Sequence, residues 1–445
     1  MPTIDKLFGR EILDSRGMPT VLATCVLKGG MCGSASVPSG ASRGTAEAFE
    51  LRDRDASRYR GLGCRRAADN INSALCRELA GQEMDQSQLD AVMVAIDGTP
   101  NKSRLGANAI LSVSIAFARA CARQQRVPLY QYFASMSGLQ IRTLPRLTIN
   151  LFSGGKHAGQ QVSIQDVLII PMSANTVDEA LATASDVYYA AAELIDARYG
   201  MRLLTADEGG LAPPFRNVDE MFALALESIE RAGYRPGEDF HLAVDVASSH
   251  FYCDGRYHID SESLDSDRMM AKISDWLMRY PILSVEDGLA EEDWEHWPRL
   301  RTLIGGHALT LGDDLLCTNA GRIQRAIETG ACDALLLKVN QVGTLSEALA
   351  SCRLARTAGW SVTLSVRSGE TEDNWAADLA VGWQADQFKN GSIRQSERLA
   401  KYNRLLEIAE ETHSLFSEWP RSASHSKLST SSRWSSRAGC ETSTT

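Results

Sequence analysis

Charged residues stand at the ends of several short apolar runs in the second half of the chain. The last polar residues of these runs are Asp245, Glu286, Asp313, Lys338, Arg367 with Ser368, and Lys389. Three carboxylates on successive strands would repel one another unless a cation lay among them, and oxygen ligands without Cys or His favour Mg²⁺. In the alternative, each carboxylate caps the next helix or pairs with a lysine. Asp287 and Asp314 are the better candidates for such supporting roles.

Lys338 ends the run ACDALLLKVNQ, where a bare ammonium is costly to bury. Beside bound metal and other cations its charged form is disfavoured, so we expect a lowered pKa and a role as a base. The alternative is an ion pair with Asp313. Glu208 lies in the glycine-rich stretch TADEGGLAPP and is the best candidate for a general acid; a glutamate in a surface loop is the alternative.

These residue types together predict one kind of reaction. A lysine base can remove a proton next to a carboxylate, and Mg²⁺ can hold the doubly charged enolate that results. A carboxylic acid can then protonate a leaving hydroxyl group. The pattern therefore indicates proton abstraction followed by β-elimination.

The elements that must position these residues alternate between strands and helices. Apolar runs such as FHLAVDV, YPILSVED and ALTLGDD are each followed by a helical pattern, which predicts parallel βα units closed into a barrel over residues 140–413. Before it, residues 1–130 combine a predicted hairpin turning at KGG with helical patterns, so we expect a small α+β domain. Residues 414–445 are rich in Ser and Thr, and we expect much of this tail to be disordered.

The composition favours a small-molecule partner. The chain has 445 residues, of which 44% are apolar and 23% charged, and a net charge of -10, which argues against nucleic acid or a membrane surface as partner. No apolar stretch has the length of a signal peptide or a membrane span, so we expect a cytoplasmic protein. The ten cysteines are scattered without a CxxC pair and are expected to be reduced.

The motifs SVPSGAS, DEGGLAP, LLLKVNQVGTLSE and RSGETEDNWAADLAVG closely resemble those of the enolase family. The resemblance runs from REILDSRGMPTV to SERLAKYNRLLEIAEE, which is nearly everything except the tail. It implies an α/β protein with an N-terminal α+β domain and a modified (β/α)8 barrel, usually a homodimer. The implied reaction is dehydration of 2-phosphoglycerate to phosphoenolpyruvate with Mg²⁺.

The resemblance also implies a role for each motif residue. Lys338 would be the base and Glu208 the acid. Asp245, Glu286 and Asp313 would bind the metal, and Ser39 in the mobile SGAS loop would bind a second metal. His157 would close over the substrate, and its carboxylate and phosphate would be bound by Lys389, Arg367 and Ser368.

The sequence departs from the family pattern around the substrate. Val366 replaces a histidine that would touch the phosphate, and Asp166, which we count with the catalytic candidates, replaces a glutamate and draws the carboxylate back by one methylene. Arg43 stands where enolases usually carry threonine, and the loop NGGSHA has become SGGKHA, which introduces Ser153 and Lys156. Arg43, Lys156 and Val366 can also be read as solvent-facing or neutral packing changes.

The gained groups are cationic, so the simplest hypothesis is a substrate with more, or differently placed, negative charge. We therefore favour a specialised enzyme resembling carboxyphosphonoenolpyruvate synthase of phosphonate antibiotic biosynthesis, which acts on a phosphorylated or phosphonylated three-carbon acid. One alternative is an ordinary glycolytic enolase. The other is an enolase-derived binding or structural protein without catalysis.

Overall fold

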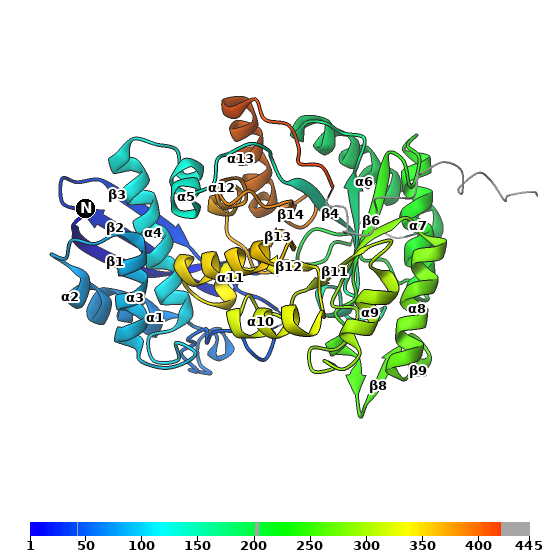
Figure 1. Ribbon diagram of the computed structural model, residues 1–445, viewed down its shortest axis with the longest axis horizontal. Coiled ribbons are helices and arrows are strands. Elements are labelled where there is room, and N and C mark those ends of the chain that lie inside the picture. The colour runs from blue at the N-terminus through cyan, green and yellow to red at the C-terminus, as the bar shows by residue number, and fades with distance from the viewer. Residues whose placement is uncertain (42, 201–203, 420–445) are drawn as a thin grey trace, which may run out of the picture.

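The structure is a computed structural model and describes residues 1–41, 43–200 and 204–419. It has two parts lying side by side, an N-terminal domain and a barrel (Figure 1). The N-terminal domain contains an antiparallel sheet in the order β1 (Ile4–Leu13), β2 (Pro19–Leu27), β3 (Cys32–Ser36). Its helices are α1 (Arg65–Asn70), α2 (Cys76–Leu79), α3 (Gln86–Asp97), α4 (Ala107–Gln125) and α5 (Leu129–Ser137).

The N-terminal sheet is closed on one side by α4. This helix is rich in alanine and is buried along almost its whole length, and it packs against β2 and β3. Small side chains allow a close approach: a Cβ on Gly33 of β3 would lie 2.3 Å from the carbonyl oxygen of Ala116 in α4. The α+β domain predicted for the first 130 residues is therefore observed, and α3, α4 and α5 join it to the barrel helices α11 and α12.

The second part is a closed barrel of eight strands with helices around it. Around the barrel the strands are β10 (Ile282–Glu286), β11 (Leu309–Gly312), β12 (Ala334–Leu337), β13 (Ser361–Ser365), β14 (Gln387–Lys389), β4 (Arg146–Ser153), β5 (Asp166–Pro171) and β6 (Phe240–Asp245). The helices are α6 (Val177–Tyr199), α7 (Val218–Arg231), α8 (Ser266–Arg279), α9 (Trp297–Ile304), α10 (Ala320–Thr329), α11 (Leu345–Thr357), α12 (Trp375–Gly382) and α13 (Ser396–Thr412). A small sheet of β7 (Tyr252–Cys253), β8 (Arg256–Ile259) and β9 (Glu262–Leu264) extends from it.

The barrel is not built only of parallel βα units, as the sequence pattern predicted. Strand β5 runs antiparallel to both of its neighbours, β4 and β6. The segment between β4 and β5 contains a single 3₁₀ turn, Gly155–His157, instead of a crossover helix, and a short connection can join only antiparallel neighbours. This exception turns the carboxyl end of β4 and the amino end of β5 toward the same edge of the barrel.

The interior of the barrel is closed at one end by the last described residues. Alternate side chains of β11 and β12, such as Leu311 and Leu336, form a cluster separate from the main core, and those of β5 and β6 form another. Trp419 packs against both clusters. Residues 414–419, which the sequence analysis assigns to the tail, thus lie against the barrel; residues 420–445 lie outside the described part.

Candidate active site

Three buried carboxylates stand at the carboxyl ends of neighbouring strands. Asp245 ends β6, Glu286 ends β10, and their Cα atoms are register partners in the parallel pair. Asp313 is the first residue after β11, the next strand around the barrel. Because neighbouring parallel strands end at the same edge of the barrel, these side chains converge at its mouth, as the sequence pattern predicted.

An ammonium group already lies between two of these carboxylates. Lys389 ends β14, and its Nζ donates to Asp245 Oδ2 at 2.8 Å and to Glu286 Oε2 at 2.6 Å. Burial and the Asp245 charge raise the pKa of Glu286 well above its ordinary value, even though Lys389 opposes this shift. Burial lowers the pKa of Lys389, but the two carboxylates outweigh burial and raise it well above the ordinary lysine value. Negative charge at this site therefore exceeds what one ammonium neutralises.

The donor set fits a hard divalent cation. Glu286 Oε1 is buried and, within the described residues, accepts no hydrogen bond. Carboxylate oxygens of this kind are the ligands that Mg²⁺ prefers, and Asp245, Glu286 and Asp313 would hold it. Across the described ranges, two groups have ligand atoms that all lie within 4.8 Å of one another: Asp287, Asp313 and Asp314, and His157, Asp166 and Glu208. Asp287 is engaged as a supporting group, since its two oxygens accept from the backbone N–H groups of Asp313 and Asp314.

Lys338 follows β12 and forms an ion pair with Asp313. Gln341 Nε2 donates to the other oxygen of that carboxylate at 2.9 Å. Burial lowers the pKa of Lys338, but the carboxylates of Asp313 and Glu286 outweigh burial, so the pKa lies above the ordinary lysine value. The prediction of a lowered pKa assumed a metal ion bound beside the lysine, and it stays a prediction. In the structure Arg367 and Lys389 also act to lower this pKa, but the carboxylates outweigh them. The observed ion pair with Asp313 is the alternative to a base that the sequence also allowed.

One cavity brings most of the predicted residues together. It is lined by Gly40, Ala41, His157, Gln165, Glu208, Asp245, Lys338, Ser365, Val366, Arg367, Ser368 and Lys389. Val366, at the position of the absent histidine, presents an apolar side chain to this cavity. Ser368 Oγ accepts from the backbone N–H of Ala41 at 2.8 Å, which ties the SGAS segment to the barrel mouth.

Arg367 is engaged by a residue that sequence reasoning missed. Its guanidinium binds the carboxylate of Glu47 through two hydrogen bonds, NH1 to Oε2 at 3.0 Å and NH2 to Oε1 at 3.1 Å. Burial lowers the pKa of Arg367, but Glu47 outweighs burial and raises it. The two residues come from different domains, so no local pattern marks the pair. The Glu47 carboxylate thus takes the bidentate position on the Arg367 guanidinium that would suit an anionic group of a substrate.

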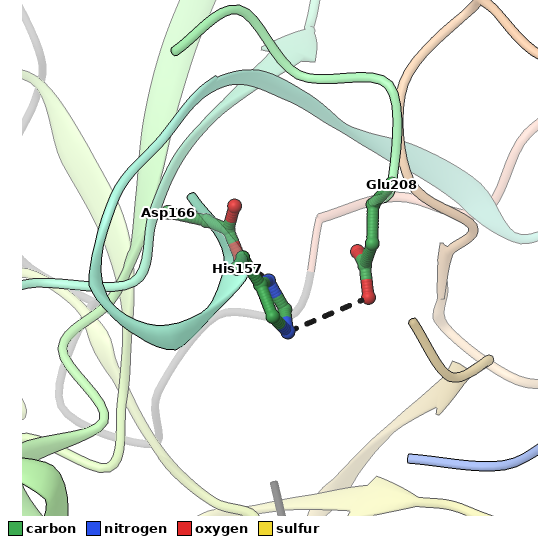
Figure 2. Close-up of side chains that lie close together, drawn as sticks. All are labelled: His157, Asp166 and Glu208. Atoms are coloured by element: carbon green, nitrogen blue, oxygen red, sulfur yellow. Dashed lines mark hydrogen bonds and ion pairs between the residues drawn. The ribbon is translucent and has the colours of Figure 1, made fainter. Parts of the chain in front are cut away.

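A second group of titratable residues consists of His157, Asp166 and Glu208 (Figure 2). The ring of His157 lies between Asp166 and Glu208: Nδ1 is 2.9 Å from Asp166 Oδ2, and Nε2 is 3.8 Å from Glu208 Oε1. Burial lowers the pKa of His157, but the two carboxylates outweigh burial and raise it to about 9. Asn150 of β4 donates to Glu208 Oε2 at 3.0 Å, another contact that sequence reasoning missed.

The charge on Glu208 differs from what a general acid needs. Burial raises the pKa of Glu208, but His157 and the cations Arg398, Lys389 and Lys338 outweigh burial, so the pKa is lowered. The raised pKa of His157 and the lowered pKa of Glu208 favour a proton on the imidazole over one on the Glu208 carboxyl. Asp166 does not reach the cavity, since it stands behind His157 with a fully buried side chain.

Three other predicted residues lie away from this cavity in the described structure. The hydroxyl of Ser39 contacts Arg52 and Glu50, and its carbonyl accepts from Arg16, so the predicted second metal ligand is engaged elsewhere. Arg43 forms an ion pair with Glu50 and lines a separate cavity. Lys156 is exposed. For Arg43 and Lys156 a substrate contact stays a prediction that requires rearrangement.

A barrel with buried carboxylates at its strand ends and a lysine beside them is the arrangement found in the enolase superfamily of enzymes. Family comparison agrees with this class. Residues 141–418 match the enolase C-terminal TIM barrel domain, and residues 4–133 match the enolase N-terminal domain. The chain belongs to the enolase family. None of its described helices has the length and apolar character needed to span a bilayer.

Proposed function

We propose that the protein is a Mg²⁺-dependent lyase that eliminates water from a 2-phosphoglycerate-like acid. The observation that carries this proposal is that Lys338 and Glu208 line one cavity from different sides. Lys338 follows β12, whereas Glu208 is held by Asn150 of β4, which lies three strands farther around the barrel. A base on one side and a proton donor on the other, here the His157 ring beside Glu208, suit removal of a proton from one carbon and of hydroxide from the next.

The residues assign each part of the reaction. A divalent cation at Asp313 and Glu286 would offset the carboxylate charges that raise the pKa of Lys338 and so would favour its neutral form. In that form Lys338 would accept the proton on C2, and the electron pair of that C–H bond would move into the substrate carboxylate. A bound divalent cation supplies the positive charge that stabilises this enolate. The electron pair then forms the C2–C3 double bond as the C3–O bond breaks, and the hydroxyl leaves as water with a proton from the His157 and Glu208 side of the cavity. Arg367 and Lys389 offer cationic contacts for the carboxylate and the phosphoryl group.

The finer proposal is a specialised substrate. We infer that the phosphorus carries a further substituent, as in a 2-O-carboxyphosphonyl glycerate, and that the product is the corresponding enolpyruvyl ester used in phosphonate antibiotic synthesis. The support is that Val366 lines the cavity in place of an imidazole donor, and that Asp166 stands back from it. Val366 changes the cavity wall directly and Asp166 lies behind His157, while the base and the metal carboxylates are retained.

An ordinary enolase is the second candidate, and a specific observation favours it. Arg43 is paired with Glu50 and Lys156 is exposed, so the two gained cations do not face the cavity in this structure. They therefore give no support to a more anionic substrate. The non-catalytic alternative would leave the buried network of Lys338, Lys389 and three carboxylates without a use.

The test compares two substrates with purified full-length protein and Mg²⁺, following product by ³¹P NMR and ultraviolet absorbance. Lys338→Ala is the blank. Preferred turnover of the carboxyphosphonyl glycerate, lost in the variant, supports the specialised enzyme, and efficient turnover of 2-phosphoglycerate alone identifies an ordinary enolase. No turnover of either compound by folded, Mg²⁺-binding protein would refute the lyase proposal.

A further inference from the structure

Ser153 and Asp166 face each other across the antiparallel pair β4 and β5. They are register partners, and both are fully buried. The Ser153 hydroxyl donates to Asp166 Oδ1 at 2.5 Å. The reaction proposed above uses neither side chain, so this short contact between two inaccessible polar groups calls for another role.

The second oxygen of Asp166 holds His157. Nδ1 of the ring lies 2.9 Å from Asp166 Oδ2, so each carboxylate oxygen has one partner. With Oδ1 fixed by the serine hydroxyl, the carboxylate plane cannot rotate freely, and the ring that binds Oδ2 is fixed with it. His157 Nε2 then points toward Glu208, as Figure 2 shows.

The surroundings leave the Ser153 hydroxyl little freedom. The backbone N–H of Ser153 donates to the carbonyl of Leu211 at 2.9 Å, which fastens β4 to the loop that carries Glu208. A Cβ on Gly210 in that loop would lie only 2.4 Å from Ser153 Oγ. The hydroxyl is thus confined between the loop and Asp166, a position that favours one orientation over exchange among several.

We propose that Ser153 is a positioning residue that acts through Asp166 to aim His157 at the Glu208 side of the cavity. The inference rests on the proposed lyase function, and it assigns Asp166 to positioning instead of contact with substrate. Ser153 and Asp166 stand where the family pattern has asparagine and glutamate, and in this chain they lie opposite each other and are hydrogen-bonded.

The first test reads the imidazole directly and needs no turnover. Full-length protein labelled with ¹⁵N-histidine is studied by long-range ¹H–¹⁵N NMR, with His157→Gln used to assign the ring. Ser153→Ala should shift or broaden the His157 ring signals. The matched control is Ser228→Ala, which removes another fully buried hydroxyl whose acceptor is the Leu224 carbonyl in α7 and should leave these signals unchanged.

A double-mutant cycle tests whether Ser153 acts through Asp166. If it does, adding Ser153→Ala to Asp166→Asn should change the ring signals little. Where turnover is measurable, Ser153→Ala should lower kcat by about ten-fold and leave KM within about two-fold, because substrate contacts remain.

Wild-type ring signals in Ser153→Ala, or additive effects in the cycle, would overturn the inference. If Ser153→Ala does not fold, Ser153→Cys gives the same test, since its somewhat larger thiol fills the site but is a weak donor. An inactive wild-type protein whose His157 signals respond as expected would refute the lyase proposal and leave the positioning role standing.

Discussion

Replacing Lys389 by methionine tests how the carboxylates at the barrel mouth are neutralised. The ammonium of Lys389 binds Asp245 and Glu286 at 2.8 and 2.6 Å, and all three groups are buried. Methionine keeps the volume of the side chain and removes the charge. The variant therefore leaves two carboxylates without the cation that now lies between them.

The structure sets the size of two opposite effects. Without metal, removal of one partner from a buried ion pair costs about 3–5 kcal/mol of folding stability. The pKa of Glu286 is already raised and will rise further, so the carboxyl can take up a proton. A carboxyl whose pKa is raised on folding destabilises the fold as it ionises, so the variant should lose stability as pH rises. Mg²⁺, in contrast, no longer competes with two charge-assisted hydrogen bonds, and its Kd should fall by about 10- to 100-fold.

Isothermal titration of Mg²⁺ into chelator-treated protein without substrate measures the affinity, and thermal unfolding measures the stability. Lys401→Met is the control, because Lys401 is an equally buried lysine that pairs with Glu370 and not with the three carboxylates. It should lose stability with no change in Mg²⁺ affinity. Equal or weaker Mg²⁺ binding by Lys389→Met would show that the ammonium and the cation do not share these carboxylates.

Three further predictions follow from other parts of the structure. His157 should titrate near pH 9 by NMR, and Asp166→Asn should lower its pKa; titration of the wild-type ring near 6.5 would contradict the pairing. Because the folded pKa lies above the unfolded value of 6.5, the stabilisation of the fold by the protonated ring should be complete below about pH 6.5 and lost as pH rises through about 9. Trp419→Ala should lower unfolding stability by about 2 kcal/mol, measured by urea denaturation, because the indole packs against both interior clusters; an unchanged midpoint would show that the contact contributes little. We also propose that the protein is a homodimer, which light scattering on a sizing column tests, and a mass of 48.6 kDa would contradict it.

The sequence predicted the barrel and the ends of its strands well. Runs such as ALLL ending on Lys338 could be read because a buried strand needs continuous apolar residues and the first polar residue marks its end. The reversed direction of β5 could not be read from the chain, since a buried strand looks the same in either direction. Only the short link between β4 and β5 carries that information.

The site shows the same limit at the level of single residues. Asp245, Glu286 and Lys389 were predicted because each ends its own strand. Glu47 was missed because its partner Arg367 lies 320 residues away in the other domain. The charges that surround Lys338 could not be read from the sequence for a related reason: the sign of a pKa shift depends on which charges lie nearest, and that is a property of the folded geometry.

The departures from the family pattern divide by location, and location decides which of them can govern substrate choice. Glu50 neutralises the charge of Arg43, and solvent screens the charge of the exposed Lys156. Val366 lines the cavity itself, and an isopropyl group there can neither donate to nor repel an oxygen of the substrate. Selectivity in this chain should therefore respond to Val366→His and be indifferent to loss of the surface charge at Lys156.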